Sequence, residues 1–139
     1  MGYAVLHIDK ARSNDSGNTA HIARTYTPSN VDPSRTHLNR ELVQFPANVT
    51  NRSEAIEHRI ATAGIYRKVA KNQVKALRFI LSSSPKDMAR IEQEGRLYEW
   101  CDESMDWLRD TFGADNVVAA TLHADEDTPH IHATVVPIV

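Results

Sequence analysis

The sequence predicts an α+β domain in which helices pack on an antiparallel β-sheet. The chain ends in two strand-like segments joined by a short turn, which indicates a hairpin. Two other stretches carry apolar residues at helical spacing. Helices packed against one face of a mainly antiparallel sheet are the economical arrangement for the predicted order strand, loop, helix, strand, helix, strand, strand. With 139 residues, the chain is expected to form a single domain, residues 1–139, that is large enough to bury a core.

The first third of the chain contains one predicted strand and a long polar segment. Residues 3–9 are mostly apolar and bounded by charge, which predicts a strand. Residues 11–52 are rich in Ser, Asn, Thr, Pro and Arg, and they show weak periodicity. So long a loop region in a compact domain is usually functional or disordered. Within it we expect short helices at residues 19–26 and 34–42.

The middle of the chain begins with a helix signal. Asn51 can cap a helix, and Glu54 follows three residues later as in a capping box. Apolar residues then recur at helical spacing, which predicts a helix through about residue 71. Residues 76–82 are apolar and predict the second strand.

The last third predicts a long helix followed by the terminal hairpin. Ser84 and the proline after it are a strong helix opening. An apolar stripe continues to Phe112 with an interruption at Gly95, and Gly113 ends the helix. Residues 116–122 and 130–138 are the two strands of the hairpin.

The composition excludes some classes of protein. Cys101 is the one cysteine, so no intrachain disulfide or thiol-based zinc site is available, which fits a reducing cytoplasm. No signal peptide and no apolar run approaching ~18 residues is present. Residues 1–80 carry a net charge of +6, whereas residues 81–139 carry −8. The basic half could meet a polyanion, or the two halves could simply attract each other.

A cluster of histidines near the end of the chain predicts a metal site. His130 and His132 are two residues apart, so on a strand both imidazoles lie on one face. The turn before them brings His123 alongside, and three imidazoles form a site for a divalent metal. Glu126 is a further ligand, an outer hydrogen-bond partner or a base. The alternative is scattered histidines on a polar hairpin, but the added His123 and Glu126 favour metal.

The nature of the ligands restricts the metal without selecting one. Imidazole nitrogens permit Mn, Zn, Ni or Co. Magnesium fits three imidazoles least well, because it prefers oxygen ligands.

A second pair of residues could take part in phosphate chemistry. His21 and Arg24 share one face if residues 19–26 are helical. Phosphoryl transfer needs a nucleophile and a positive group that stabilises developing charge. Taken alone the pair is a weak signal, since a surface histidine near an arginine is far more common than a catalytic one.

A third segment, a turn leading into the predicted short helix at residues 34–42, is dense in hydrogen-bonding groups. Arg35 and Arg40 could hold phosphates, while Asn30 and Asn39 could contact bases or brace a loop. The alternative is ordinary turn chemistry that starts at Asp32.

These three segments together resemble the motifs of Mob/Pre (MobV-type) plasmid-mobilisation relaxases, a family of the HUH endonuclease superfamily. The resemblance runs over essentially the whole chain. The matching segments are His21-x-x-Arg24, then Asn30-x-Asp32-Pro33-Ser34-Arg35-x-x-Leu38-Asn39, then His123-x-Asp125-Glu126-x-Thr128-Pro129-His130-x-His132-x-x-x-Val136-Pro137. The resemblance implies the palm fold of relaxases and replication initiators, an antiparallel sheet flanked by helices with the His-x-His strand near its centre. It also implies an enzyme that nicks one DNA strand at an origin of transfer, for mobilisation of a plasmid or integrated element.

The resemblance also implies roles for single residues. His123, His130 and His132 would bind a divalent metal, with Mn²⁺ expected first, and Glu126 would be a ligand or proton acceptor beside it. His21 would attack the phosphate and stay joined to the 5′ end, and Arg24 would stabilise the phosphate charge. From their hydrogen-bonding groups and charges, we expect the DNA-binding residues to be Asn30, Asp32, Arg35, Asn39 and Arg40.

Tyr26 is the alternative nucleophile. Most HUH relaxases use tyrosine, and Tyr26 is the one tyrosine close to these motifs. Family members often have a tyrosine directly after the Leu-Asn of the second motif, where this chain has Arg40. This departure favours His21.

The resemblance finally implies which partners the protein binds. The expected partners are single-stranded or hairpin origin DNA, other proteins of the transfer machinery and a second copy bound through a region beyond residue 139, all in the bacterial cytoplasm. The chain is thus expected to be truncated relative to full-length relaxases.

Two rival functions remain open at this point. One rival is a replication-initiator-like nickase, which would need a tyrosine nucleophile beyond the metal strand. The other is a non-catalytic DNA-binding module with a structural metal.

Overall fold

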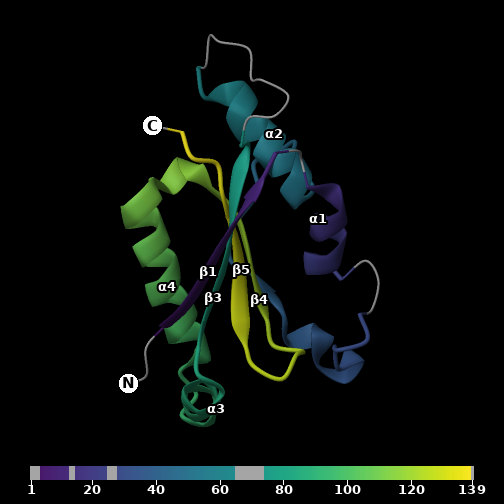
Figure 1. Ribbon diagram of the computed structural model, residues 1–139, viewed down its shortest axis with the longest axis vertical. Coiled ribbons are helices and arrows are strands. Elements are labelled where there is room, and N and C mark those ends of the chain that lie inside the picture. Colours follow the sequence, from purple (N-terminus) through teal and green to yellow (C-terminus); the bar gives the residue numbers. More distant parts are fainter. Residues whose placement is uncertain (1–3, 13–14, 25–27, 65–73, 139) are drawn as a thin grey trace.

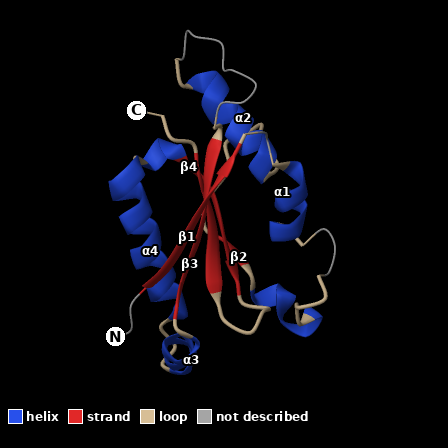
Figure 2. Cartoon of the chain, in the orientation of Figure 1, coloured by secondary structure: helices blue, strands red, loops and turns tan. Residues whose placement is uncertain are grey.

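The structure is a computed structural model that describes residues 4–12, 15–24, 28–64 and 74–138. In this part of the chain one antiparallel sheet is formed in the strand order β1-β3-β5-β4-β2 (Figures 1 and 2). The strands are β1 (Ala4–Ala11), β2 (Arg40–Glu41), β3 (Ala76–Ser83), β4 (Val117–His123) and β5 (His130–Val135). The predicted antiparallel sheet is confirmed, and the His-x-His strand, β5, is its central strand.

Helices cover both faces of this sheet, and Figure 1 shows α4 on one side and α1 and α2 on the other. The helices are α1 (Ser16–Ile22), α2 (Arg52–Thr62), α3 (Pro85–Gln93) and α4 (Leu97–Phe112), with 3₁₀ turns η1 (Pro33–Leu38) and η2 (Ala114–Asn116). The predicted packing on one face was therefore wrong. The reason is that β4 is buried along its whole length, so both of its faces need cover.

Two apolar cores fill the spaces between the sheet and its helices. On one face, Met105 and Leu108 of α4 pack against Phe79 of β3 and Ile131 of β5. On the other face, Ile56 of α2 lies in a smaller core with β4 and β3 residues. Because side chains alternate along a strand, the burial of Ile131 under α4 places its neighbours in β5 on the α1 and α2 side.

Two predicted helices end earlier than expected from the sequence. The helix expected to run to residue 71 ends at Thr62, because Gly64 takes a left-handed conformation (φ 72°). Residues 65–73 lie outside the described part. The helix expected at residues 19–26 is α1, which ends at Ile22, and Arg24 beyond it is also left-handed (φ 56°).

The predicted helix at residues 34–42 was wrong over its second half. The 3₁₀ turn η1 begins after Asp32, whose carboxylate accepts from the Ser34 amide at 3.0 Å. Residues 40–41 are instead the short edge strand β2, where Arg40 pairs with Leu122 of β4. A strand of two residues has no alternation by which a sequence pattern could indicate it.

The last third of the chain follows the prediction closely. Gly95 separates α3 from α4 and Gly113 ends α4, both with positive φ. The final strand ends at Val135 instead of residue 138. No helix within the described residues has the length and apolar character needed to span a membrane.

Candidate active site

The three predicted metal-binding histidines converge at the β4–β5 hairpin. His123, the last residue of β4, pairs directly with His130, the first residue of β5, and His132 lies two residues further along β5. The ring centroids of His123 and His132 are 4.6 Å apart, and those of His130 and His132 are 4.9 Å apart. The predicted convergence is confirmed, on the sheet face that α1 and α2 cover.

Each imidazole presents one nitrogen to a common centre. His123 Nε2 lies 2.8 Å from the Ile22 carbonyl and His130 Nδ1 lies 2.8 Å from the Thr128 carbonyl. Because a carbonyl only accepts, these outer nitrogens carry the protons and the inner nitrogens are left with lone pairs. The inner nitrogen of His123, Nδ1, is buried and has no hydrogen-bond partner among the described residues. An unsatisfied buried acceptor is costly, and a cation would satisfy it.

The spacing of the inner atoms suits one metal ion. His130 Nε2 and His132 Nε2 are 3.1 Å apart, and Glu126 Oε2 lies 3.4 Å from His130 Nε2 and 3.5 Å from His123 Nδ1. All four ligand atoms lie within 4.8 Å of one another. Nitrogens that share an ion at about 2.1 Å stand roughly 3 Å apart when they are at right angles. His123, Glu126, His130 and His132 therefore fit a divalent metal.

Burial keeps two of these histidines in the metal-binding form. Burial lowers the pKa of His132 to about 2, and the neighbouring rings of His123 and His130 add to the effect. Burial likewise lowers the pKa of His123 to about 4, against the hydrogen bond to Ile22. Both rings are therefore neutral at pH 7, as metal coordination requires.

His21 lies beside this cluster, although it is far away in the sequence. It belongs to the last turn of α1, and its ring centroid is 6.4 Å from that of His132 in an edge-on arrangement. The juxtaposition of the predicted nucleophile and the predicted metal ligands is therefore present. Tyr26, the alternative nucleophile, lies outside the described residues.

Arg24 joins the end of α1 to the hairpin. Its guanidinium donates to both carboxylate oxygens of Asp125, at 2.9 and 3.0 Å, and to Glu126 Oε2 at 2.7 Å. It also donates to the His21 carbonyl at 3.0 Å, and its side chain is only 7% exposed. These contacts hold Glu126 beside the histidines, so in this structure Arg24 organises the site.

Asp125 is a residue of the site for which no role was predicted from the sequence. It is fully buried and accepts hydrogen bonds from Thr36 at 2.8 Å and Asn39 at 3.1 Å in addition to those from Arg24. Burial alone would raise the pKa of its carboxyl, but hydrogen bonds from Arg24, Thr36 and Asn39 hold it well below its ordinary value. Burial distinguishes it from the neighbouring acids, Glu126 and Asp127, and the sequence carries no local signal of that burial.

Replacing Asp125 with alanine should destabilise the fold by about 3–5 kcal/mol, because Arg24 would keep a buried charge without its main partner. The matched control is Asp127→Ala, because this exposed neighbour should change stability by less than ~0.5 kcal/mol. Urea unfolding of both variants measures the difference. Equal stability of the two variants would contradict the assignment of Asp125 as the anchor of this network.

Three of the predicted DNA-binding residues brace the turn before β2. Asn30 donates to Glu126 Oε1 at 2.9 Å, and Asp32 caps η1. Asn39 donates to Asp125 and accepts from the Ala124 amide at 2.7 Å. Of the two uses that the sequence left open for the asparagines, the structure shows the bracing one.

The two predicted phosphate-binding arginines lie nearer the surface. Arg35 is 42% exposed in its side chain and pairs with Glu92 at 3.2 Å. The guanidinium of Arg40 lies 5.4 Å from the centre of the Tyr98 ring, which is itself half exposed. Both cations remain accessible to a partner from solvent.

Proteins of one family match this chain along almost its whole length. The family model for plasmid recombination enzymes, Mob_Pre, matches residues 1–139. A plasmid recombination enzyme type 3 from Staphylococcus aureus is 32% identical over 146 residues, covering 99% of this chain and 34% of that protein. A plasmid recombination enzyme from a Bacillus species is 33% identical over 147 residues, with the same coverage. The chain thus spans about a third of the length of the curated relatives it matches.

A solved structure matches the fold. The crystal structure of the MobM relaxase domain (MOBV; Mob_Pre), Mn-bound and bound to plasmid pMV158 oriT DNA, superposes with a TM-score of 0.85 at 27% sequence identity. The match covers 99% of this chain and 71% of that domain.

Proposed function

The chain belongs to the Mob/Pre family of plasmid recombination enzymes, and from that premise we propose that residues 1–139 are the catalytic core of a relaxase. The proposed enzyme uses a divalent metal to cleave one DNA strand at an origin of transfer. It remains attached to the 5′-phosphate, for mobilisation of a plasmid or integrated element. The observation that carries the proposal is that the His21 ring lies beside a four-ligand metal site.

The proposed metal is Mn²⁺, held by His123, His130 and His132 with Glu126 as the oxygen ligand. The MobM relaxase domain is Mn-bound in its crystal structure, and the neutral imidazoles here suit the same ion. The bound ion would polarise the scissile phosphate and offset its charge. Zn²⁺, Ni²⁺ and Co²⁺ remain alternatives with the same ligands, and Mg²⁺ is the least favoured.

The residues of the chain supply the rest of the chemistry. A His21 ring nitrogen attacks the phosphorus with its lone pair, so that a P–N bond forms as the P–O3′ bond breaks. The imidazole ring gives up its N–H proton, and the departing 3′ oxygen takes up a proton to become the 3′-hydroxyl. Glu126, which accepts a hydrogen bond from Arg24, would carry the proton from the imidazole ring to the 3′ oxygen. The phosphoramidate keeps the energy of the broken bond, so the strand can later be rejoined.

The partner of the proposed enzyme is origin-of-transfer DNA in single-stranded or hairpin form, met in the bacterial cytoplasm. Arg35 and Arg40 remain proposed phosphate contacts, whereas Asn30, Asp32 and Asn39 would act by shaping the turn. Binding to other proteins of the transfer machinery, and to a second copy of this chain, remains a proposal from the resemblance.

The test is a nicking assay on a supercoiled plasmid that carries the origin of the mobile element encoding this chain. With Mn²⁺ we expect open circles with protein attached to the 5′ end, and with EDTA we expect none. Unfolding on metal removal, followed by circular dichroism, would favour the non-catalytic module instead. An adduct on a tyrosine would favour the replication-initiator-like nickase. A Mn²⁺-loaded, folded protein that leaves the origin plasmid intact would contradict the proposal.

A further inference from the structure

Arg52, the first residue of α2, is a buried arginine that contacts two other elements, α1 and β5, on the sheet face that carries the histidines. Its side chain is only 5% exposed. Its Nε donates to Thr134 Oγ1 of β5 at 2.6 Å. Its Nη1 donates to Thr19 Oγ1 of α1 at 3.1 Å, and its Nη2 pairs with the Asp15 carboxylate at 3.0 Å. One guanidinium therefore joins α1, α2 and β5.

The contacts of Arg52 lie next to residues of the proposed active site. Thr134 follows the metal ligand His132 by two residues on β5, so both side chains are on the same face of the sheet. Thr19 precedes His21 by two residues in α1, and Asp15 is the cap position of that helix. Arg52 thus links the strand that carries the proposed metal ligand His132 directly to the helix that carries the proposed nucleophile.

The helix α1 needs such a link. It has only seven residues, and a helix this short is not stable without tertiary contacts. It is also flanked by Asp15 (φ 61°) and Arg24 (φ 56°), which are the two non-glycine residues with positive φ in the described part of the chain. Such conformations cost free energy and persist where the surroundings fix them.

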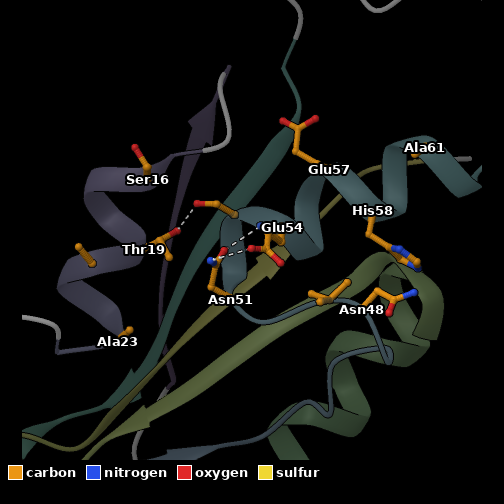
Figure 3. Close-up of a pocket in the computed structure, with 12 residues that line it drawn as sticks. Ser16, Thr19, Ala23, Asn48, Asn51, Glu54, Glu57, His58 and Ala61 are labelled. Carbon is orange, nitrogen blue, oxygen red and sulfur yellow. Dashed lines mark hydrogen bonds between the residues drawn. The ribbon is translucent and has the colours of Figure 1, made fainter.

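Each of these strained residues is held by an arginine–carboxylate pair. Arg24 pairs with Asp125 and Glu126 at the end of α1, and Arg52 pairs with Asp15 at its beginning. The hydroxyls of Thr19 and Ser53 add a 2.7 Å hydrogen bond beside Arg52, in the wall of an open groove between α1 and α2 (Figure 3). Both ends of α1 are therefore held by ion pairs on the sheet face that carries the histidines.

A buried ion pair of this kind is not required for stability. Replacing one with packed apolar side chains is often neutral or favourable, because both charges must lose their hydration. What an apolar side chain cannot supply is the set of directed hydrogen bonds to Thr134, Thr19 and Asp15. We propose that Arg52 is a positioning residue, which sets the placement of His21 relative to the metal ligands. This inference rests on the proposed function.

The test compares Arg52→Met with wild type and with Arg59→Met. Arg59 lies in the same helix, but it donates to Asn116 and not to α1. Protein with isotope-labelled histidine is loaded with Mn²⁺ in the absence of DNA. NMR then measures how strongly the bound Mn²⁺ enhances the relaxation of the His21 ring protons. This enhancement falls with the sixth power of the distance between Mn²⁺ and the ring protons, so a small displacement of α1 changes it measurably.

In Arg52→Met we expect Mn²⁺ affinity within twofold of wild type, a severalfold weaker enhancement at His21 and partial recovery in Arg52→Lys. Arg59→Met should match wild type. The first-order rate of adduct formation at saturating origin DNA should fall about 10–100-fold in Arg52→Met, with DNA affinity unchanged.

Wild-type enhancement and rate in Arg52→Met would overturn the proposal. If that variant does not fold, Thr134→Val removes only the β5 contact, and the same comparison decides: a weaker enhancement supports the proposal and a wild-type value overturns it. A normal enhancement in a wild-type protein that never nicks origin DNA would overturn the proposed function alone, and absence of Mn²⁺ binding would overturn both.

Discussion

Replacing His21 with alanine should abolish the covalent protein–DNA adduct and lower strand cleavage by at least about 10³-fold. The imidazole of His21 lies edge-on to His132, with 6.4 Å between ring centroids, so a phosphate held by the metal would be within its reach. Loss of the nucleophile leaves the metal site complete. The variant should therefore bind Mn²⁺ with wild-type affinity while it forms no adduct in a denaturing gel.

The control for this prediction is Tyr26→Phe. It removes the hydroxyl of the alternative nucleophile and leaves the ring, so the adduct should form at a rate close to that of wild type. If His21→Ala still formed the adduct and Tyr26→Phe did not, Tyr26 would be the nucleophile and His21 would not.

Replacing His132 with alanine should lower Mn²⁺ affinity by at least about 100-fold, since loss of even an outer-shell partner often costs 10–100-fold. His132 is on the central strand, and its Nε2 lies 3.1 Å from His130 Nε2. Burial keeps its ring neutral at pH 7, so no proton competes with the metal there. Nicking at fixed Mn²⁺ should fall in parallel.

Isothermal titration with Mn²⁺ measures this loss, and His37→Ala is the matched control, because His37 is an exposed histidine in η1 outside the cluster. Circular dichroism should show that His132→Ala keeps its fold. Wild-type Mn²⁺ affinity in His132→Ala would contradict the ligand assignment. Unfolding of the wild type by EDTA would instead indicate a structural metal.

The sequence predicted the convergence of the three histidines well because its geometry is local. The period of two along a strand places His130 and His132 on one face, and a tight hairpin brings His123 opposite. The helix boundaries at Gly95 and Gly113 were equally local, because glycine favours the left-handed conformation that ends a helix. Predictions of this kind depend only on residues close together in the chain.

The rest of the site depends on contacts between distant segments. Asp125 and Arg52 look like ordinary surface charges in the sequence, and only the folded chain shows that they are buried in pairs with Arg24 and Asp15. The short strand β2 exists because β4 offers it an edge to pair with. The second helical layer was missed for a similar reason, since burial of both faces of β4 is a property of the assembled sheet.

Mapping the residue that carries the DNA adduct shows directly whether His21 attacks a phosphate held at the histidine cluster. The protein is incubated with Mn²⁺ and origin DNA, digested with nuclease and protease, and its modified peptide is sequenced by mass spectrometry. We expect a nucleotide 5′-phosphate on His21, joined through a P–N bond that is lost in mild acid. An acid-stable phosphate ester on Tyr26 would contradict it.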